Sequence, residues 1–239
     1  MNQMNPSVCR SERSALSKSQ AIPSVFVVDD DISVRESLEL LILEAGWQAE
    51  TFGSAEAFLD QLRTPGPSCL VLDVHLPGLN GLDLQKLLAD RSETPIVFIT
   101  GDADVRTTVQ AMKAGAFEFL PKPISDDMLL NVVRRALEHS EVLIRREAER
   151  RELRDRYASL SRREREVMML VASGLLNKQV GGELGISEIT VKAHRGSMMR
   201  KMGADSFAGL VSMALSLRLT RPPLEVTLRS TSHSMPALR

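Results

Sequence analysis

The chain has 239 residues, which is enough for one large domain or two of modest size. Hydrophobic residues make up 43% of it and charged residues 26%, a balance that allows packed cores and excludes a chain that is disordered throughout. The formal net charge is only −1, so the composition as a whole favours neither an acidic nor a basic partner.

Residues 1–23 are rich in serine and lack hydrophobic periodicity, so we expect a disordered leader. They also lack the apolar core of a signal peptide, and no apolar run in the chain approaches the roughly 18 residues that span a bilayer. We therefore expect a cytoplasmic protein. The two cysteines, Cys9 and Cys69, do not form the pattern of a disulfide framework or metal site. We expect one thiol outside the core and one small core residue.

Residues 24–140 alternate between short apolar runs and amphipathic segments. The expected strands are 25–29, 47–52, 69–73, 96–100 and 117–120. The expected helices are 32–45, 54–62, 81–89, 102–114 and 125–139. Strands that alternate with helices pair in parallel through right-handed crossovers, and most of these runs are continuously apolar, as in a sheet covered on both faces. The fold class predicted for this part is therefore α/β, with an open, doubly wound, flavodoxin-like sheet of five parallel strands.

Residues 141–160 contain six arginines and five acidic residues but no glycine or proline, so we expect a helical linker. Its apolar positions do not sustain a heptad, and both a solvated connecting helix and a dimerising coiled coil remain open. Residues 161–217 have a helical pattern throughout. Residues 218–239 contain two adjacent prolines and many hydroxyl residues, so we expect a disordered tail.

Residues 161–217 also contain the pattern of a helix-turn-helix. Ser161 followed by Glu164 forms a capping box, and Gly174 ends the first helix. The segment NKQVGGELGIS predicts a short helix and a turn at Gly185, and residues 187–202 form the next helix. Residues 207–217 complete an all-α domain of four helices. A tight glycine-containing turn between two short helices is typical of proteins that place the second helix in the major groove of DNA.

The charges divide between these two parts. Acidic residues outnumber basic ones 19 to 9 over residues 24–140, whereas basic residues outnumber acidic ones 8 to 5 over residues 161–217. An acidic module joined to a mildly basic one indicates a different partner for each half.

Polar residues follow the expected strands of the first part. Asp29 and Asp30 end the first strand, Asp73 the third and Thr100 the fourth, and Lys122 follows the fifth. The carboxyl ends of parallel strands open on one edge of a sheet, so we expect these side chains to meet there. Carboxylates held together need a cation, and oxygen ligands of this kind suit Mg²⁺. Such a site would stabilise a phosphoryl group and let a carboxylate attack it.

Simpler interpretations of these residues exist. Asp29 and Asp30, with the next residue Asp31, could begin a helix, where acidic side chains favour the helix dipole. Lys122 could be a surface lysine, although the flanking Pro121 and Pro123 favour a fixed backbone, and a cis Lys122–Pro123 bond is compatible with that frame.

The segments VVDD, LDVHLPGLNG, FITG and LPKP, in this order and each at a strand end, resemble the receiver domain of two-component response regulators. The resemblance implies that a sensor histidine kinase phosphorylates Asp73. It implies that Mg²⁺ is held by Asp29, Asp30, Asp73 and the backbone carbonyl of His75. It also implies that the phosphoryl group is bound and sensed by Thr100, Lys122 and the switch aromatic Phe119.

The stretch LLNKQV…ELGISEITVKAHR resembles the LuxR-type effector of the NarL/FixJ family, and is similar to FixJ- and StyR-like proteins. The two resemblances cover residues 24–217. This second one implies binding of double-stranded DNA by Lys192, Arg195, His194, Thr190 and Lys178, and a dimer contact through the last helix. Two departures stand out: Gly181-Gly182, where the family usually has alanines, and Gly196, where some relatives have a longer side chain.

We therefore expect a response regulator rather than an enzyme. It would be a phosphoprotein that forms a homodimer when phosphorylated. The dimer would bind a promoter, recruit RNA polymerase and regulate transcription, with the family resemblance favouring an activator. One alternative is a Mg²⁺-dependent phosphatase that forms an aspartyl-phosphate. Such enzymes have a second aspartate two residues after the first, where this chain has His75. The other alternative, a receiver that acts only through protein partners, leaves the basic helix 187–202 unexplained.

Overall fold

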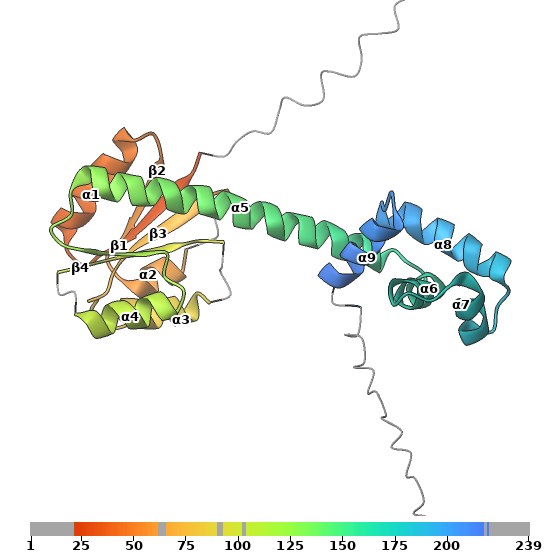
Figure 1. Cartoon of the computed structure of the whole chain (residues 1–239). Coiled ribbons are helices and arrows are strands. Elements are labelled where there is room, and N and C mark those ends of the chain that lie inside the picture. The colour runs from red at the N-terminus through yellow and green to blue at the C-terminus, as the bar shows by residue number, and fades with distance from the viewer. Residues whose placement is uncertain (1–21, 62–65, 90–92, 102–103, 218, 220–239) are drawn as a thin grey trace, which may run out of the picture. The chain divides into compact units, whose positions relative to one another are not determined.

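The computed structural model describes residues 22–61, 66–89, 93–101, 104–217 and 219 (Figure 1). The chain divides into two compact units, one that runs to Arg146 and one that begins at Glu147. Cys9, nearly all of the expected leader 1–23 and nearly all of the expected tail 218–239 lie outside the described residues.

The first unit is built on a parallel sheet of five strands with the order β2-β1-β3-β4-β5. The strands are β1 (Ser24–Val28), β2 (Gln48–Phe52), β3 (Ser68–Asp73), β4 (Ile96–Thr100) and β5 (Glu118–Pro121). This confirms the predicted doubly wound α/β fold. Strands β1, β3 and β4 are buried along their whole length, as expected for central strands with helices on both faces.

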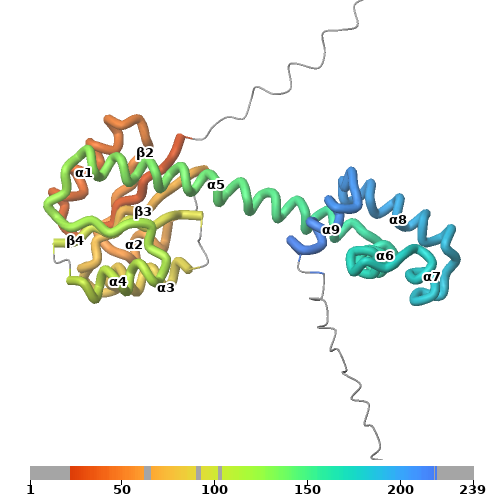
Figure 2. Tube along the Cα trace, in the orientation of Figure 1, coloured from red at the N-terminus to blue at the C-terminus, as the bar shows by residue number. Residues whose placement is uncertain are grey.

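Among the described residues, five helices accompany these strands. Figures 1 and 2 show how they lie around the sheet. They are α1 (Ile32–Glu44), α2 (Ala55–Leu59), α3 (Gly81–Leu87), α4 (Val105–Lys113) and α5 (Asp126–Ala158). Because side chains alternate along a strand, β1 serves both faces of the sheet. Phe26 and Val28 pack with α2, α3 and α4, while Val25 and Val27 pack with α1 and α5. Cys69 is fully buried on the face of the sheet that packs with α1 and α5, and this burial raises the pKa of its thiol.

The helices begin where short polar side chains cap them. Asp31, Ser54, Asn80 and Asp104 each accept a hydrogen bond from a backbone N–H of the first turn. Several helices are shorter than expected: α2 ends at Leu59, and α4 starts at Val105 because Asp104 caps it. Hydrophobic spacing predicted that these helices exist, but the caps set their first residues.

Helix α5 continues without a break from Asp126 through the expected linker to Ala158. Its early residues Leu129, Val133 and Leu137 belong to the core of the first unit. Leu153 and Tyr157, near its end, pack against the core of the second unit, where Arg156 also donates a 3.0 Å hydrogen bond to the carbonyl oxygen of Met202. Two apolar side chains of the expected linker, Leu153 and Tyr157, thus pack within this chain.

In its described residues, which end at residue 219, the second unit has helices and no strands, as predicted. After the end of α5 it contains α6 (Arg162–Ala172), α7 (Asn177–Leu184), α8 (Glu188–Met202) and α9 (Phe207–Ser216). Its core is aliphatic and rich in methionine, with the fully buried residues Val167, Met168, Val180, Val191, Met198, Met202 and Leu210. Helices α7 and α8 form the helix-turn-helix.

The turn between α7 and α8 depends on two glycines. Gly185 ends α7 in the left-handed conformation with φ of 65°, which a residue without a side chain adopts most easily. Gly181 is buried, and its carbonyl oxygen accepts a hydrogen bond from the N–H of Ile186. A Cβ atom on Gly181 would lie 2.7 Å from the carbonyl oxygen of Ile186, whereas one on Gly182 would meet nothing within 4 Å.

The two adjacent glycines of α7 should therefore respond differently to alanine. Gly182→Ala should raise the free energy of unfolding of the second unit by about 0.5–1 kcal/mol, because alanine is the better helix former and the position is open. Gly181→Ala should fall short of that gain, because the Ile186 carbonyl must move. Urea unfolding followed by circular dichroism tests this. The fluorescence of Trp47, the only tryptophan, monitors the first unit as a control. Equal gains in the free energy of unfolding for the two variants would show that the Ile186 carbonyl moves away from a Cβ at position 181 at no cost.

Candidate functional site

The expected polar residues of the first unit meet at the carboxyl edge of its sheet. Asp73 and Thr100 are the last residues of β3 and β4, Asp29 directly follows β1, and Lys122 directly follows β5. Asp29, Asp73 and Thr100 are all buried. Parallel strands with matched ends place side chains from distant parts of the sequence within hydrogen-bonding distance.

Lys122 joins two of the carboxylates. Its Nζ atom lies 2.7 Å from Oδ2 of Asp29 and 2.7 Å from Oδ2 of Asp73. The Asp29 side chain is completely buried and that of Asp73 is 9% exposed, so neither charge is hydrated as a surface carboxylate would be. Such buried charges need a partner, and Lys122 provides it. The Lys122–Pro123 peptide bond that follows is cis.

Burial and charge pull the pKa values of this cluster in opposite directions. Burial raises the pKa of Asp29, although hydrogen bonds from Lys122 and from the N–H of Asp31 oppose the rise. Burial would lower the pKa of Lys122, but its hydrogen bonds to Asp29 and Asp73 outweigh it, so that pKa is raised. The ammonium group therefore stays charged, and the site favours additional positive charge.

Asp30 completes the acidic cluster. It is exposed, and the carboxylates of Asp29, Asp30 and Asp73 can each offer one oxygen within 4.8 Å of the others. Asp31 is also exposed, and it alone of the three consecutive aspartates caps α1. The alternative that Asp29 and Asp30 serve as helix-starting residues does not match these positions.

Two residues that the sequence analysis did not single out hold the backbone of this site. Arg35 donates hydrogen bonds to the carbonyl oxygens of Asp29, at 2.7 Å, and Asp30, at 3.0 Å. Gly81 lies so close to the backbone that follows β3 that a Cβ at this position would be 2.3 Å from the Asp73 carbonyl oxygen. Gly81 is the last residue of the motif LDVHLPGLNG and could have been found from the sequence. Arg35 lies within an ordinary helix, and no sequence pattern indicates its role.

Loop and switch residues surround Asp73. The backbone N–H of His75 donates to Oδ1 of Asp73 at 2.9 Å, and its ring Nδ1 lies 3.2 Å from the Thr100 hydroxyl. Phe119 is half-buried on β5, and its ring centroid lies 6.1 Å from that of Phe98 in the layer with α2, α3 and α4. Thr100 and Phe119 thus occupy neighbouring strands. The Thr100 hydroxyl lies at the end of β4, whereas the Phe119 ring lies among the side chains that pack between the sheet and α2, α3 and α4.

The helix-turn-helix presents the expected DNA-binding residues in different ways. Lys178 and Lys192 are exposed, and Lys192 forms a 3.3 Å ion pair with Glu188 on its own helix. Thr190 is half-buried, with its hydroxyl 2.8 Å from that of Ser187, the residue that caps α8. Of these, the two lysines present the most accessible positive charge.

Arg195 and His194 are more enclosed. Arg195 donates a 3.0 Å hydrogen bond to Oδ1 of Asn177, and its guanidinium lies over the Phe207 ring at 5.3 Å. These contacts use its charge and its planar face inside the domain. His194 is half-buried. The sequence showed which basic residues lie on α8 but not which of them contact neighbouring helices.

Glu164 ties α6 to α8. Its carboxylate completes the predicted capping box by accepting from the N–H of Ser161, and it also accepts from the Ser197 hydroxyl at 2.6 Å and from Lys201 at 2.7 Å. The contact with Lys201, followed by that with Ser197, lowers the pKa of Glu164 to about 2. Lys201 is therefore a structural partner of Glu164.

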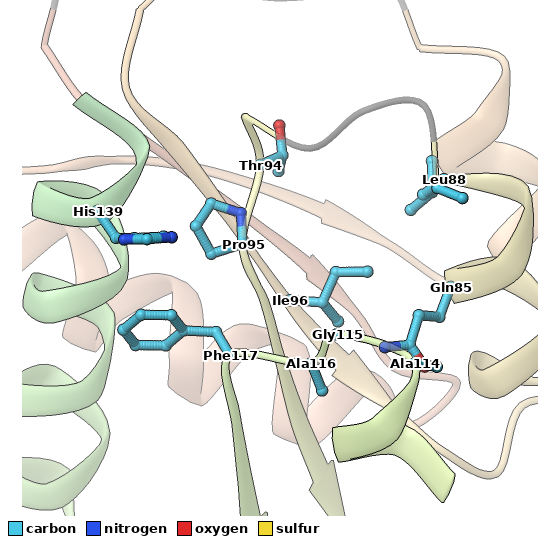
Figure 3. Close-up of a pocket in the computed structure, with 11 residues that line it drawn as sticks. Gln85, Leu88, Thr94, Pro95, Ile96, Ala114, Gly115, Ala116, Phe117 and His139 are labelled. Atoms are coloured by element: carbon cyan, nitrogen blue, oxygen red, sulfur yellow. The ribbon is translucent and has the colours of Figure 1, made fainter. Parts of the chain in front are cut away.

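A hollow of about 440 Å³ opens at the other edge of the sheet, where β4 begins (Figure 3). Phe117 and His139 line one side of it with ring centroids 5.6 Å apart, and Gln85 lies on the other. The Gln85 side chain is buried and donates to the carbonyl oxygen of Ala111. None of the expected site residues lines this hollow.

Two family models match the chain. Residues 25–134 match the response regulator receiver domain, and residues 158–214 match the luxR family of bacterial regulatory proteins. Among described residues, no helix is both long enough and apolar enough to cross a membrane.

Similar proteins match across both units. Nodulation protein W of Bradyrhizobium diazoefficiens is 49% identical over 206 residues, which cover 85% of this chain and 90% of that protein. Transcriptional regulatory protein FixJ of the same organism is 41% identical, covering 80% of this chain and 94% of its own. The solved structure of the response regulator StyR is 45% identical with a TM-score of 0.71, covering 82% of this chain and 99% of that one.

The Glu164 contacts predict a specific loss of stability on neutralisation. Glu164→Gln should lower the free energy of unfolding of the second unit by about 1.5–3 kcal/mol at neutral pH, the range for a hydrogen bond to a charged group. Because the folded-state pKa lies near 2, below the ordinary 4.5, this contribution is present above pH 4.5 and is lost as pH falls toward 2. Urea unfolding at several pH values measures it.

Glu166→Gln is the matched control for this measurement. Glu166 pairs with Arg162 and Arg163 at the surface of the same helix, so its loss should cost less than about 1 kcal/mol. If the two variants lost equal stability, or if the Glu164 difference persisted at pH 2, the charge of the buried Glu164 carboxylate would not be the cause.

Proposed function

The chain belongs to the response regulators that join a receiver domain to a LuxR-type DNA-binding domain, and on that premise we propose that phosphorylation of Asp73 switches it as a transcriptional regulator. The observation that carries the proposal is Lys122, whose ammonium group lies 2.7 Å from the carboxylates of both Asp29 and Asp73. This arrangement offers a nucleophilic carboxylate with a fixed positive charge beside it.

The proposed reaction is transfer of a phosphoryl group to Asp73. A carboxylate oxygen of Asp73 attacks the phosphorus of a phosphohistidine on a sensor kinase. The new P–O bond forms as the P–N bond breaks, and the imidazole leaves with the bonding electron pair. Lys122 then pairs with the phosphoryl oxygens, and the Thr100 hydroxyl donates a hydrogen bond to one of them.

Mg²⁺ suits the donor set of this site. Asp29, Asp30 and Asp73 offer three carboxylates, and the carbonyl of His75 would add a fourth oxygen, which is the ligand chemistry that Mg²⁺ prefers. When bound, the ion supplies positive charge that offsets repulsion between the carboxylates and a phosphoryl group. The completely buried Asp29 and the exposed Asp30 would serve as ligands, while Asp73 would also be the nucleophile.

In this proposal the signal passes through Thr100 and Phe119. Once phosphorylated, the protein forms a homodimer, binds two half-sites in a promoter and recruits RNA polymerase as an activator in the cytoplasm. Lys192 and Lys178 are the leading candidates for DNA contacts because both are exposed. Thr190 and His194 are half-buried, and Arg195 would have to leave Asn177 to take part.

The phosphorylation site has a direct test. With labelled acetyl phosphate and Mg²⁺, the wild-type protein should take up label in a lasting, near-stoichiometric amount, and Asp73→Ala should take up none. Asp60→Ala is the control, because it removes an exposed carboxylate distant in sequence from the cluster. Stoichiometric labelling of the Asp73 variant would refute the assignment. Release of phosphate over many turnovers by the wild type would indicate a phosphatase.

The coupling to DNA has a separate test. Selection of sites from random duplexes, with and without beryllium fluoride and Mg²⁺, should enrich a motif of two half-sites only in the activated wild-type sample, with Asp73→Ala as the control. A motif enriched equally in all samples would contradict control by phosphorylation. Absence of any motif would favour a receiver that acts through protein partners.

A further inference from the structure

The exposed face of α8 is unusual for a basic DNA-binding helix. Residues three, four and seven apart share one side of a helix, so Ile189, Lys192, Ala193 and Gly196 lie together. The first three are exposed and Gly196 is half-exposed. The apolar residues Val191, Met198 and Met202 occupy the opposite side and are fully buried. Lys192 is thus the single charged side chain of these four.

Ile189 is not one of the described residues that form the core of the second unit. Its side chain is 79% exposed in the first turn of α8, while Val191 fills the core below that turn. A β-branched residue is also a weaker helix former than alanine or lysine. Single exposed apolar residues are common on protein surfaces, but this one lies one turn before Lys192, where a recognition helix meets base edges.

The rest of this face allows close approach. Ala193 has a short side chain, and a Cβ on Gly196 would meet only the end of the Arg200 side chain, at 3.9 Å. Between Ile189 and Gly196, Lys192 is therefore the one long side chain on this face. The apolar part of this face, formed by Ile189 beside the small residues Ala193 and Gly196, fits against methyl groups. The C5-methyl of thymine is the apolar group that a base pair presents in the major groove.

We propose that Ile189 is a specificity-determining residue that contacts the C5-methyl group of a thymine in each half-site. The inference rests on the proposed DNA-binding function. Ile189 precedes Lys192 by three residues, about 4.5 Å along the helix axis. Since base pairs are stacked about 3.4 Å apart, the thymine lies within one or two base pairs of the base that Lys192 contacts.

Replacement of thymine by deoxyuridine removes only the methyl group and so tests this contact directly. In a selected site bound by the activated full-length protein, one thymine per half-site should weaken binding about fourfold when replaced, the effect of losing one buried methyl group. The Ile189→Ala variant should bind the original site more weakly. At that position it should show no further loss with deoxyuridine. Circular dichroism should show an intact fold, because the side chain is exposed.

Met169→Ala is the matched control, since Met169 is also an exposed apolar residue, 41% exposed on α6. It should respond to deoxyuridine as the wild type does. If the wild type and Ile189→Ala lose the same affinity at every thymine, or if no thymine affects the wild type, the role of Ile189 is refuted while DNA binding stands. If the activated wild type selects no DNA, the proposed function itself is refuted, and this assignment with it.

Discussion

The ammonium group of Lys122 connects the ends of three strands that are far apart in the sequence, because it pairs with Asp29 after β1 and Asp73 at the end of β3 and itself follows β5. Without it two buried carboxylates would face each other in a site that excludes most water. The rest of the first unit supports this contact. The parallel register aligns the strand ends, and Arg35 binds the backbone carbonyl of Asp29 after β1. Gly81, which has no side chain, lets the backbone at Asp73 lie close to the start of α3.

The second unit uses a buried carboxylate and a lysine for a different purpose. Glu164 accepts hydrogen bonds from Ser161, Ser197 and Lys201, all of them groups of the protein itself, so it links two helices. At the sheet edge, by contrast, the exposed Asp30 adds a third carboxylate beside the Lys122 pair. A lysine paired with one carboxylate is therefore structural at Glu164, whereas one lysine beside three carboxylates at the sheet edge leaves an excess of negative charge that suits a cation.

Hydrophobic periodicity and motif order predicted the architecture well. Continuous apolar runs that end in aspartate or threonine located the central strands and the acidic pocket, and the glycine at position 185 located the turn of the helix-turn-helix. The unpredicted features are contacts between segments that are distant in sequence. Arg195 was predicted to bind DNA, and the structure adds contacts with Asn177 and Phe207, which come from two other segments. No local pattern shows which basic side chain folding will enclose.

The separation of the two sides of α8 has an evolutionary consequence. The side chains that hold the helix in the domain, such as Val191 and Met198, are not those that face outward at positions 189, 192, 193 and 196. Substitutions on the outward side therefore leave the core of the domain intact. After a gene duplication, two copies of this chain could acquire different target promoters through a few changes on that side, without first passing through an unstable ancestor.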